Sequence, residues 1–282
     1  MIRLGAHMSI AGGVDRAIER GASIGCDTIQ IFLKNNMQWT GKKLTDAEAR
    51  RFRTAQTRFG MMPVFAHSCY LINLAAANAR IRRKSVRAVI DEIGRATAIG
   101  IPFIVMHPGA HMGIGENVGL ETIAGSLDEA FRATRRSPVM IALETTAGQG
   151  TNLGYRFEHL AEILERSPFP NRLAVCVDTC HLFAAGYDIR TPKGYATTMK
   201  QLDATIGCER VVAFHLNDSK KPLGSRVDRH EHIGKGQIGL DGFRNVLRDP
   251  RWRDVPMVLE TPKSDDLHED VENLRVLRSL AN

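Results

Sequence analysis

The sequence contains no run of about 18 apolar residues, the length that a membrane-spanning helix needs. Its first residues, MIRLGAHMSIAGG, lack the long apolar core and the cleavage site of a signal peptide. We therefore expect a cytoplasmic protein without a membrane partner. The five cysteines are odd in number, widely scattered and without a CxxC pair, so we expect all of them to be reduced.

No linker, low-complexity tract or charge block divides the 282 residues. This length is typical of one (β/α)8 barrel, and a content of 43% apolar residues is enough for a sizeable core. We predict a single domain over residues 1–282.

The net charge of +7 suits a polyanionic partner, because lysine and arginine neutralise phosphates. The signal is weak alone, since positive charges such as those between Arg80 and Arg87 are typical of a solvated helix surface.

Eight short apolar runs recur along the chain without strict alternation, as in parallel strands that are buried on both faces. They are IRLGAH, TIQIFLK, MPVFAHS, FIVMHPG, VMIALETT, LAVCVDTCH, RVVAFHLND and PMVLETP. Segments with helical spacing lie between them, at 14–24, 46–59, 81–99, 120–135, 157–165 and 267–280. Gly25, Gly60 and Gly100 follow three of these segments, as helix-terminating glycines do. The pattern predicts an α/β fold, a (β/α)8 TIM barrel, with a doubly wound open sheet as the main alternative.

Six of the predicted strands end on a side chain that can bind a metal. These residues are His67, His107, Glu144, Asp178, His215 and Glu260. One such residue alone is more typical of a structural hydrogen bond or a helix cap. Six in phase with the strand repeat would meet at the C-terminal mouth of the barrel, where they would repel or stay unsatisfied without a cation. The phasing therefore predicts a metal centre.

Three more candidates lie in loops: His181 in DTCH, and Asp228 and His230 as a D-x-H pair. The nine candidates are too many for one ion, since a catalytic zinc takes three protein ligands plus water. They suit three ions if some carboxylates bridge. Nitrogen and oxygen ligands without thiolate fit zinc (Zn²⁺) best, with manganese or iron as alternatives. Clustered metals favour phosphoester hydrolysis over sugar isomerisation.

The segment GKGQIG at 234–239 matches the G-x-G-x-x-G pattern of nucleotide-binding loops. It does not follow a strand in a suitable βαβ unit, so we expect its glycines to shape the long loop that carries Asp228 and His230. Among the remaining histidines, His159 and His268 are expected at the surface of helices. His7 is a candidate for the lining of the pocket, and His232 is not expected to be a ligand.

Long motifs spread over nearly the whole chain resemble the endonuclease IV family, the zinc-dependent apurinic/apyrimidinic endonucleases of base-excision repair. The matching segments are GAHMSIAGG at 5–13, HSCYLINLA at 67–75, HPGAH at 107–111, LETTAGQGTNLG at 143–154, VDTCHLFAAGYD at 177–188, HLNDSK at 215–220, GSRVDRHEHIGKGQIG at 224–239 and LETP at 259–262.

The resemblance implies three zinc ions. His67, His107 and Glu144 would hold the first, Glu144 with Asp178, His215 and Glu260 the second, and His181, Asp228 and His230 the third. It implies attack of a metal-bridging hydroxide on the phosphate 5′ to an abasic sugar, which leaves a 3′-hydroxyl and a 5′-deoxyribose phosphate. Glu144, which would place the water, and Glu260 are the expected catalytic residues. Removal of blocking groups from 3′ ends and a monomeric state are implied too.

The resemblance also implies that the enzyme bends double-stranded DNA and extrudes the abasic nucleotide. Tyr70 and Leu71 match the intercalating loop of the family, although they could instead pack beneath that loop. The remaining expected DNA contacts are Ser9, Asn35, Met37 and Gln38. Met37 stands where a basic residue is expected, and a thioether cannot bind phosphate.

Two other hypotheses remain open at this point. A sugar isomerase or epimerase on the same barrel would use one or two metals and leave the Asp228 and His230 pair without a role. A non-catalytic DNA-binding protein would hold only a structural metal.

Overall fold

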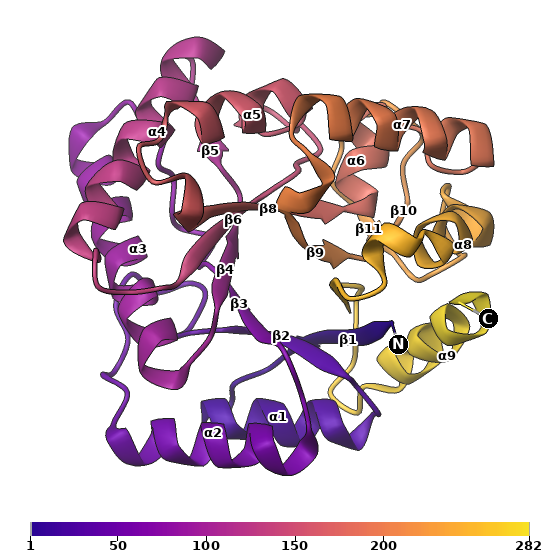
Figure 1. Ribbon diagram of the computed structural model, residues 1–282, viewed down its shortest axis with the longest axis horizontal. Coiled ribbons are helices and arrows are strands. Elements are labelled where there is room, and N and C mark those ends of the chain that lie inside the picture. The colour runs from indigo at the N-terminus through magenta and orange to yellow at the C-terminus, as the bar shows by residue number, and fades with distance from the viewer. Residues whose placement is uncertain (1, 282) are drawn as a thin grey trace.

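The structure, a computed structural model, describes residues 2–281 and shows a closed barrel of parallel strands (Figure 1). The strands are β1 (Arg3–Met8), β2 (Thr28–Phe32), β3 (Val64–His67), β4 (Phe103–Met106), β6 (Met140–Glu144), β8 (Leu173–Asp178), β9 (Val211–His215) and β12 (Pro256–Leu259). Strand β12 closes the barrel against β1, with Arg3 opposite Pro256. The closure confirms the predicted TIM barrel, and the doubly wound open sheet is wrong.

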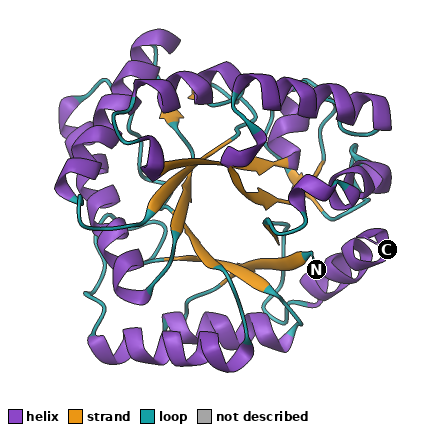
Figure 2. Cartoon of the chain, viewed as in Figure 1, coloured by secondary structure: helices purple, strands orange, loops and turns teal. Residues whose placement is uncertain are grey.

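Helices form a ring around the barrel (Figure 2). They are α1 (Val14–Ser23), α2 (Asp46–Phe59), α3 (Ala79–Ile99), α4 (Glu116–Ala133), α5 (Phe157–Arg166), α6 (Thr179–Ala185), α7 (Pro192–Thr205), α8 (Gly239–Arg248) and α9 (His268–Ala281). Local chemistry sets their ends. Thr45 and Glu48 form a capping box at the start of α2, and Gly60 ends the helix at φ 63°. Gly100 ends α3 in the same left-handed conformation, as predicted.

The sequence pattern does not reveal α6, α7 and α8. Helix α6 has only 7 residues, too few for a periodicity to be visible. Helix α7 contains a proline, a glycine and several threonines, which are weak helix formers, and it depends on tertiary packing instead.

The barrel interior is packed with side chains from alternate strand positions. Its inner cluster consists of Phe65, Phe103, Val105, Ala142, Ala174, Cys176, Ala213 and Val258. Phe65 and Phe103 stack with their ring centroids 4.9 Å apart. Burial of a side chain of this size contributes about 1.5–3 kcal/mol, so the filled interior gives the strand ends a rigid base.

The loops at the C-terminal end of the strands carry two small antiparallel sheets. One pairs β5 (Gly109–Ala110) with β7 (Asn152–Leu153), and the other pairs β10 (Asp218–Ser219) with β11 (His230–Glu231). The pairing of β10 with β11 folds the long loop after β9 back toward the mouth, as expected for a loop that contributes to a site. Single 3₁₀ turns lie at η1 (Pro170–Arg172), η2 (Cys208–Arg210) and η3 (Pro250–Trp252).

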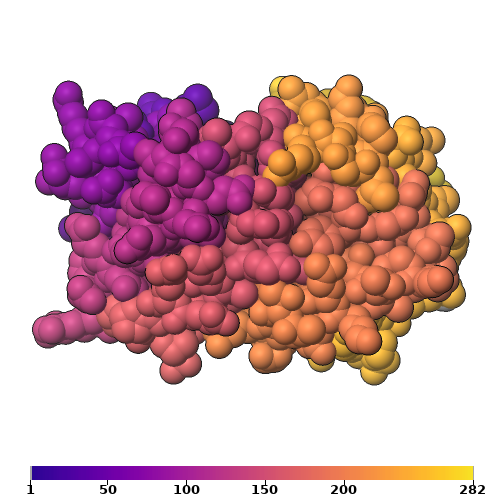
Figure 3. Space-filling view, turned by 90° about the horizontal axis from the view of Figure 1, so that it is seen from above, coloured from indigo at the N-terminus to yellow at the C-terminus, as the bar shows by residue number. Residues whose placement is uncertain are grey.

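In the side view the N-terminal half, indigo to magenta, and the C-terminal half, orange to yellow, lie on opposite sides of one body (Figure 3). Over residues 2–281, each helix is too short or too polar to cross a membrane.

Candidate metal centre and DNA-contact surface

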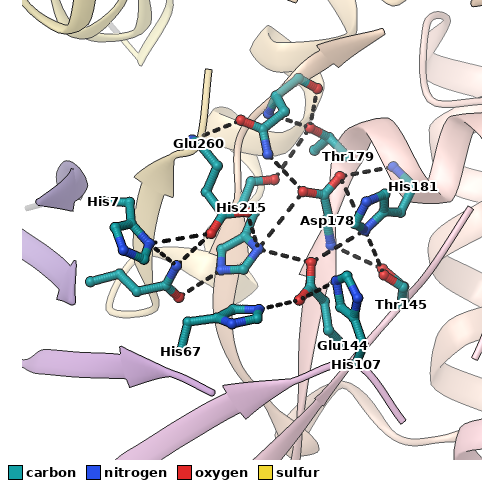
Figure 4. Close-up of polar contacts among 12 residues, drawn as sticks. His7, His67, His107, Glu144, Thr145, Asp178, Thr179, His181, His215 and Glu260 are labelled. Carbon is teal, nitrogen blue, oxygen red and sulfur yellow. Dashed lines mark hydrogen bonds and ion pairs between the residues drawn. The ribbon is translucent and has the colours of Figure 1, made fainter. Parts of the chain in front are cut away.

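The mouth of the barrel gathers the six predicted strand-end residues (Figure 4). Four are the last residues of their strands, namely His67, Glu144, Asp178 and His215, while His107 and Glu260 lie directly after β4 and β12. Because parallel strands all end at the same rim, residues far apart in the sequence converge there. The structure thus brings together what the strand phasing predicted.

Glu144 lies at the centre of the cluster with its two oxygens facing different neighbours. Its Oε2 lies 3.1 Å from Nε2 of His67 and 3.2 Å from Nε2 of His107. Its Oε1 lies 3.0 Å from Nδ1 of His215. A carboxylate in this position can bridge two cations, one on each oxygen.

A second group surrounds Nδ1 of His215. This nitrogen lies 3.2 Å from Oε2 of Glu260 and 3.7 Å from Oδ2 of Asp178, in addition to its contact with Glu144. The donor atoms of these four residues all lie within 4.8 Å of one another.

The three candidates that were expected in loops also meet, although the structure places His181 in helix α6 and His230 in strand β11, and only Asp228 in a loop. Nε2 of His181 lies 3.0 Å from Oδ2 of Asp228, and Nε2 of His230 lies 3.3 Å from its Oδ1. Both nitrogens are buried and have no hydrogen-bond partner, so they face the carboxylate without bonding to it. That geometry is expected for ligands that converge on a cation, and it fits a metal.

Cys180 lies close enough to Asp228 and His230 to complete an alternative set of donor atoms. Burial raises the pKa of its thiol to about 12. A protonated thiol is a poor metal ligand, so the imidazole of His181 is the better donor here.

The outer ring nitrogens of four histidines are each held by an oxygen, so that the inner nitrogen faces the cluster. Three of these oxygens are backbone carbonyls: Nδ1 of His67 lies 2.7 Å from that of Ser68, Nδ1 of His181 lies 2.9 Å from that of Thr145, and Nδ1 of His230 lies 3.1 Å from that of Glu260. The fourth is a side-chain oxygen, since Nε2 of His215 lies 2.8 Å from Oε1 of Gln30. An oxygen acceptor requires the outer nitrogen to carry the proton. The inner nitrogen then presents a lone pair, which is the arrangement that orients metal-binding histidines.

Neighbouring charges at the site shift the pKa values of its buried side chains. Burial opposes ionisation of Glu144, but positive charge at His215 and His107 holds its pKa well below the usual range. Burial likewise opposes protonation of His181, but Asp178 and Asp228 raise its pKa well above the usual range. Buried carboxylates therefore need positive charge at this point, and bound cations would supply it.

Two residues that the sequence patterns missed support these candidate ligands. The side-chain amide of Asn217 donates to Oδ2 of Asp178 at 2.7 Å, and its oxygen accepts from the backbone N–H of Glu260 at 2.8 Å. Gln30 donates from Nε2 to Oε1 of Glu260 at 2.5 Å. Asn217 lies two residues after His215, which is the only sequence signal that could have indicated it.

The glycine-rich segment at 234–239 wraps around a protein carboxylate. Both oxygens of the buried Asp218 accept backbone N–H groups of this segment, from Gly234, Gly236, Ile238 and Gly239. A Cβ on Gly236 would lie 2.4 Å from the carbonyl oxygen of Ser219, so only glycine fits there. The segment shapes the loop, as expected, and its N–H groups are already satisfied.

Residues expected to contact DNA rim the mouth. Ser9, Asn35, Met37 and Gln38 lie at least partly open to solvent, and Met37 is 65% accessible. Tyr70 is 56% exposed, whereas Leu71 is half-buried and packs against the core. The contacts of these residues with DNA stay a prediction.

Tyr70 separates two hollows that adjoin the ligand cluster. The larger, of 620 Å³, extends from Ser9 and Asn35 to Glu260 and includes His7. The smaller, of 330 Å³, lies over His67 and His107. His7 thus lines the pocket.

One prediction about the other histidines is wrong. His159 is 1% exposed, because its Nδ1 accepts the backbone N–H of Gly154 and Nε2 accepts from Arg156. His268 lies at the surface, as predicted. All five cysteines are free, and four of them are buried.

The fold and site define a class, the metal-dependent enzymes built on a xylose isomerase-like TIM barrel. The model of that family, described as xylose isomerase-like TIM barrel, matches residues 18–280. The chain is 55% identical over 280 residues to a probable endonuclease 4 of Chloroflexus aurantiacus, and the match covers 99% of this chain and 98% of that protein. It is 51% identical over 277 residues to a probable endonuclease 4 of Citrifermentans bemidjiense, with 98% of each chain covered.

The crystal structure of endonuclease IV from Thermus thermophilus superposes with a TM-score of 0.87 at 39% identity, and the match covers 99% of this chain and 98% of the other. The chain therefore belongs to the endonuclease IV family of apurinic/apyrimidinic endonucleases, which are metal-dependent DNA-repair hydrolases.

A D-tagatose 3-epimerase-like protein shares the fold at a TM-score of 0.75 and 19% identity. The sugar-epimerase alternative thus has support only at the level of the fold.

Proposed function

We propose that this enzyme hydrolyses the phosphodiester 5′ to an abasic site in double-stranded DNA with three bound Zn²⁺ ions, and leaves a 3′-hydroxyl and a 5′-deoxyribose phosphate. The main support is the orientation of four imidazoles, whose outer nitrogens are held by oxygens while the inner nitrogens face carboxylates. Manganese or iron at one of the positions is compatible with the same ligands.

This chain offers three or four ligands for each proposed metal position, with Glu144 shared between two of the positions. The first would use His67, His107 and Glu144, and the third His181, Asp228 and His230. The second would use Glu144 again, with Asp178, His215 and Glu260. The opposite directions of the two Glu144 oxygens support its role as the bridge.

Metal ions at these positions would supply an acidified water and would neutralise charge on the phosphate. The chain's own residues then orient the reaction. Glu144 and Glu260 fix where the nucleophile and the phosphate lie, and Asn217 and Gln30 hold Asp178 and Glu260 in place. Burial of Glu144 and Asp178 excludes competing water molecules and strengthens their electrostatic effect.

Tyr70 is proposed to stack in the space left by the extruded nucleotide, with Leu71 supporting the loop from below. Ser9, Asn35, Met37 and Gln38 would contact the DNA around it. The exposure of Tyr70 between two hollows supports the wedge, because a residue with a purely structural role would be buried.

We further propose action on blocked 3′ ends, a monomeric state and one domain over residues 1–282. The cytoplasmic location stays a prediction.

The test is incision of a duplex that carries one abasic-site analogue, with the metal content of the same preparation measured by mass spectrometry. We expect a single cut 5′ to the analogue, three metal ions per chain, and loss of cutting after treatment with a chelator. A metal-loaded, folded protein that leaves this duplex intact would disprove the proposal. One ion per chain would disprove the trinuclear centre.

A further inference from the structure

Over its first two turns, one exposed face of helix α3 carries positive charge alone. Arg80, Arg83, Lys84 and Arg87 are all exposed and follow the spacing i, i+3, i+4 and i+7, which places them on one face over the first turns of the helix. Within the part of the chain that the structure describes, none of the four forms an ion pair. We call these four residues the α3 basic face.

This arrangement opposes the helix's own electrostatics. The N-terminal end of a helix is positive and favours acidic side chains, and the first turn of α3 contains none. Arg80 with Lys84, and Arg83 with Arg87, are like-charge pairs at i, i+4, which destabilise a helix. Helix α2, by contrast, begins with Asp46 and Glu48. The sequence alone was compatible with an ordinary solvated helix surface, but such a surface mixes both signs and this face does not. An external anion therefore explains the α3 basic face better.

The α3 basic face adjoins the proposed DNA-contact loops. Helix α3 begins shortly after the loop that carries Tyr70. The Nζ of Lys84 lies 4.4 Å from the ring centroid of Trp39, and the guanidinium of Arg95 donates to the carbonyls of Lys42 and Gly41. The loop from Asn35 to Lys42 therefore runs along this helix. Met37, at its tip, has no charge to offer a phosphate.

We propose that the α3 basic face binds the phosphate backbone of the duplex on one side of the lesion, independently of sequence. Arg80 to Arg87 spans about 10 Å along the helix, over which one DNA strand advances by about three phosphates. The proposal rests on the proposed function, since it takes DNA as the substrate. In this proposal, a helix outside the barrel mouth supplies the electrostatic part of the affinity for DNA.

The test compares two triple variants with the same loss of charge. The first is Arg80→Gln, Arg83→Gln, Arg87→Gln, which leaves Lys84 on Trp39. The control is Arg132→Gln, Arg135→Gln, Arg136→Gln, three positions at and just beyond the C-terminal end of α4, at the opposite end of the barrel. Binding of undamaged duplex is measured by fluorescence anisotropy over a series of KCl concentrations, and incision of abasic duplex is measured over a range of DNA concentrations up to saturation.

We expect the first variant to lower the slope of log K against log salt by about 1 to 3, since each lost phosphate contact contributes roughly 0.9. Its KM for abasic duplex should rise while kcat stays unchanged, and the control should match the wild type. Equal slopes in all three proteins, or an equal loss in both variants, would overturn the proposal. The Tm of the α3 triple variant should equal or exceed that of the wild type. A lower Tm would overturn the argument from helix electrostatics. Because the slope is measured on undamaged DNA, it stands even if incision of abasic sites fails.

Discussion

The side-chain oxygen of Gln30 lies 2.8 Å from Nε2 of His215, and the nitrogen of the same amide donates to Glu260 at 2.5 Å. One buried amide therefore orients two proposed ligands of the same metal. Because the amide oxygen contacts Nε2 of His215, Nδ1 of that ring points toward the cluster as a donor atom. The amide N–H group bonds to Oε1 of Glu260, so Oε2 stays available to a metal. Strand β2, which supplies no ligand of its own, in this way contributes to the site.

Replacement of Gln30 by Met should weaken metal binding at the second position. Met has nearly the same volume, so packing is retained while the hydrogen bonds to His215, Glu260 and His7 are lost. Loss of such supporting contacts typically costs 10–100-fold in metal affinity. Competition with a zinc-sensitive dye should show one of the three ions released at a roughly tenfold lower chelator concentration. Gln201→Met, at an exposed position of α7, is the control, and equal release from both variants would contradict the assignment.

Glu260→Gln should lower the incision rate at saturating DNA by roughly 100-fold or more, since a direct ligand should cost at least as much as its supporting partners. DNA binding should persist, because Glu260 lies below the rim residues. A quenched-flow incision assay and an anisotropy titration measure the two effects separately. The control Glu269→Gln lies in a mostly exposed acidic group with Asp266 and His268. If Glu260→Gln retained the wild-type rate, the metal at this position would be structural.

The sequence predicts the cluster well because its members follow the strand repeat, and each strand-end residue that it names lies there; their role as metal ligands stays a prediction. Gln30 was not predictable in this way, because an amide at the middle of a strand resembles any buried polar residue. The role of Asp218 was not predictable for a different reason. Of its five backbone donors, one comes from its neighbour and four come from a segment some 16 to 21 residues further along the chain. His159 was misplaced for another reason: its partners Gly154 and Arg156 are close in the sequence, but helical spacing alone does not show that its ring faces them.

Tyr70→Ala should weaken binding of abasic duplex by about 1 to 3 kcal/mol, the usual contribution of an aromatic ring that stacks on bases. The stability of the free protein should change little, since the side chain is 56% exposed. Tyr70→Phe, which keeps the ring, should bind like the wild type. Isothermal titration and thermal unfolding of both variants separate affinity from stability. A large drop in Tm with unchanged affinity would show that Tyr70 only packs against Phe32 and His67.

Asp218→Asn should destabilise the protein by about 3 kcal/mol in urea unfolding. The carboxylate is fully buried and accepts N–H groups from Ser219 and from the glycine-rich segment. An amide would turn its own N–H groups toward those donors, and each buried polar group left unsatisfied costs about 1–3 kcal/mol. The same loop carries Asp228 and His230, so the third metal position should lose its ion first. The exposed Asp241→Asn on α8 should change stability by no more than about 0.5 kcal/mol. An equal loss in both variants, or a loss of stability with all three metal ions retained, would show that Asp218 does not hold the loop on the metal centre.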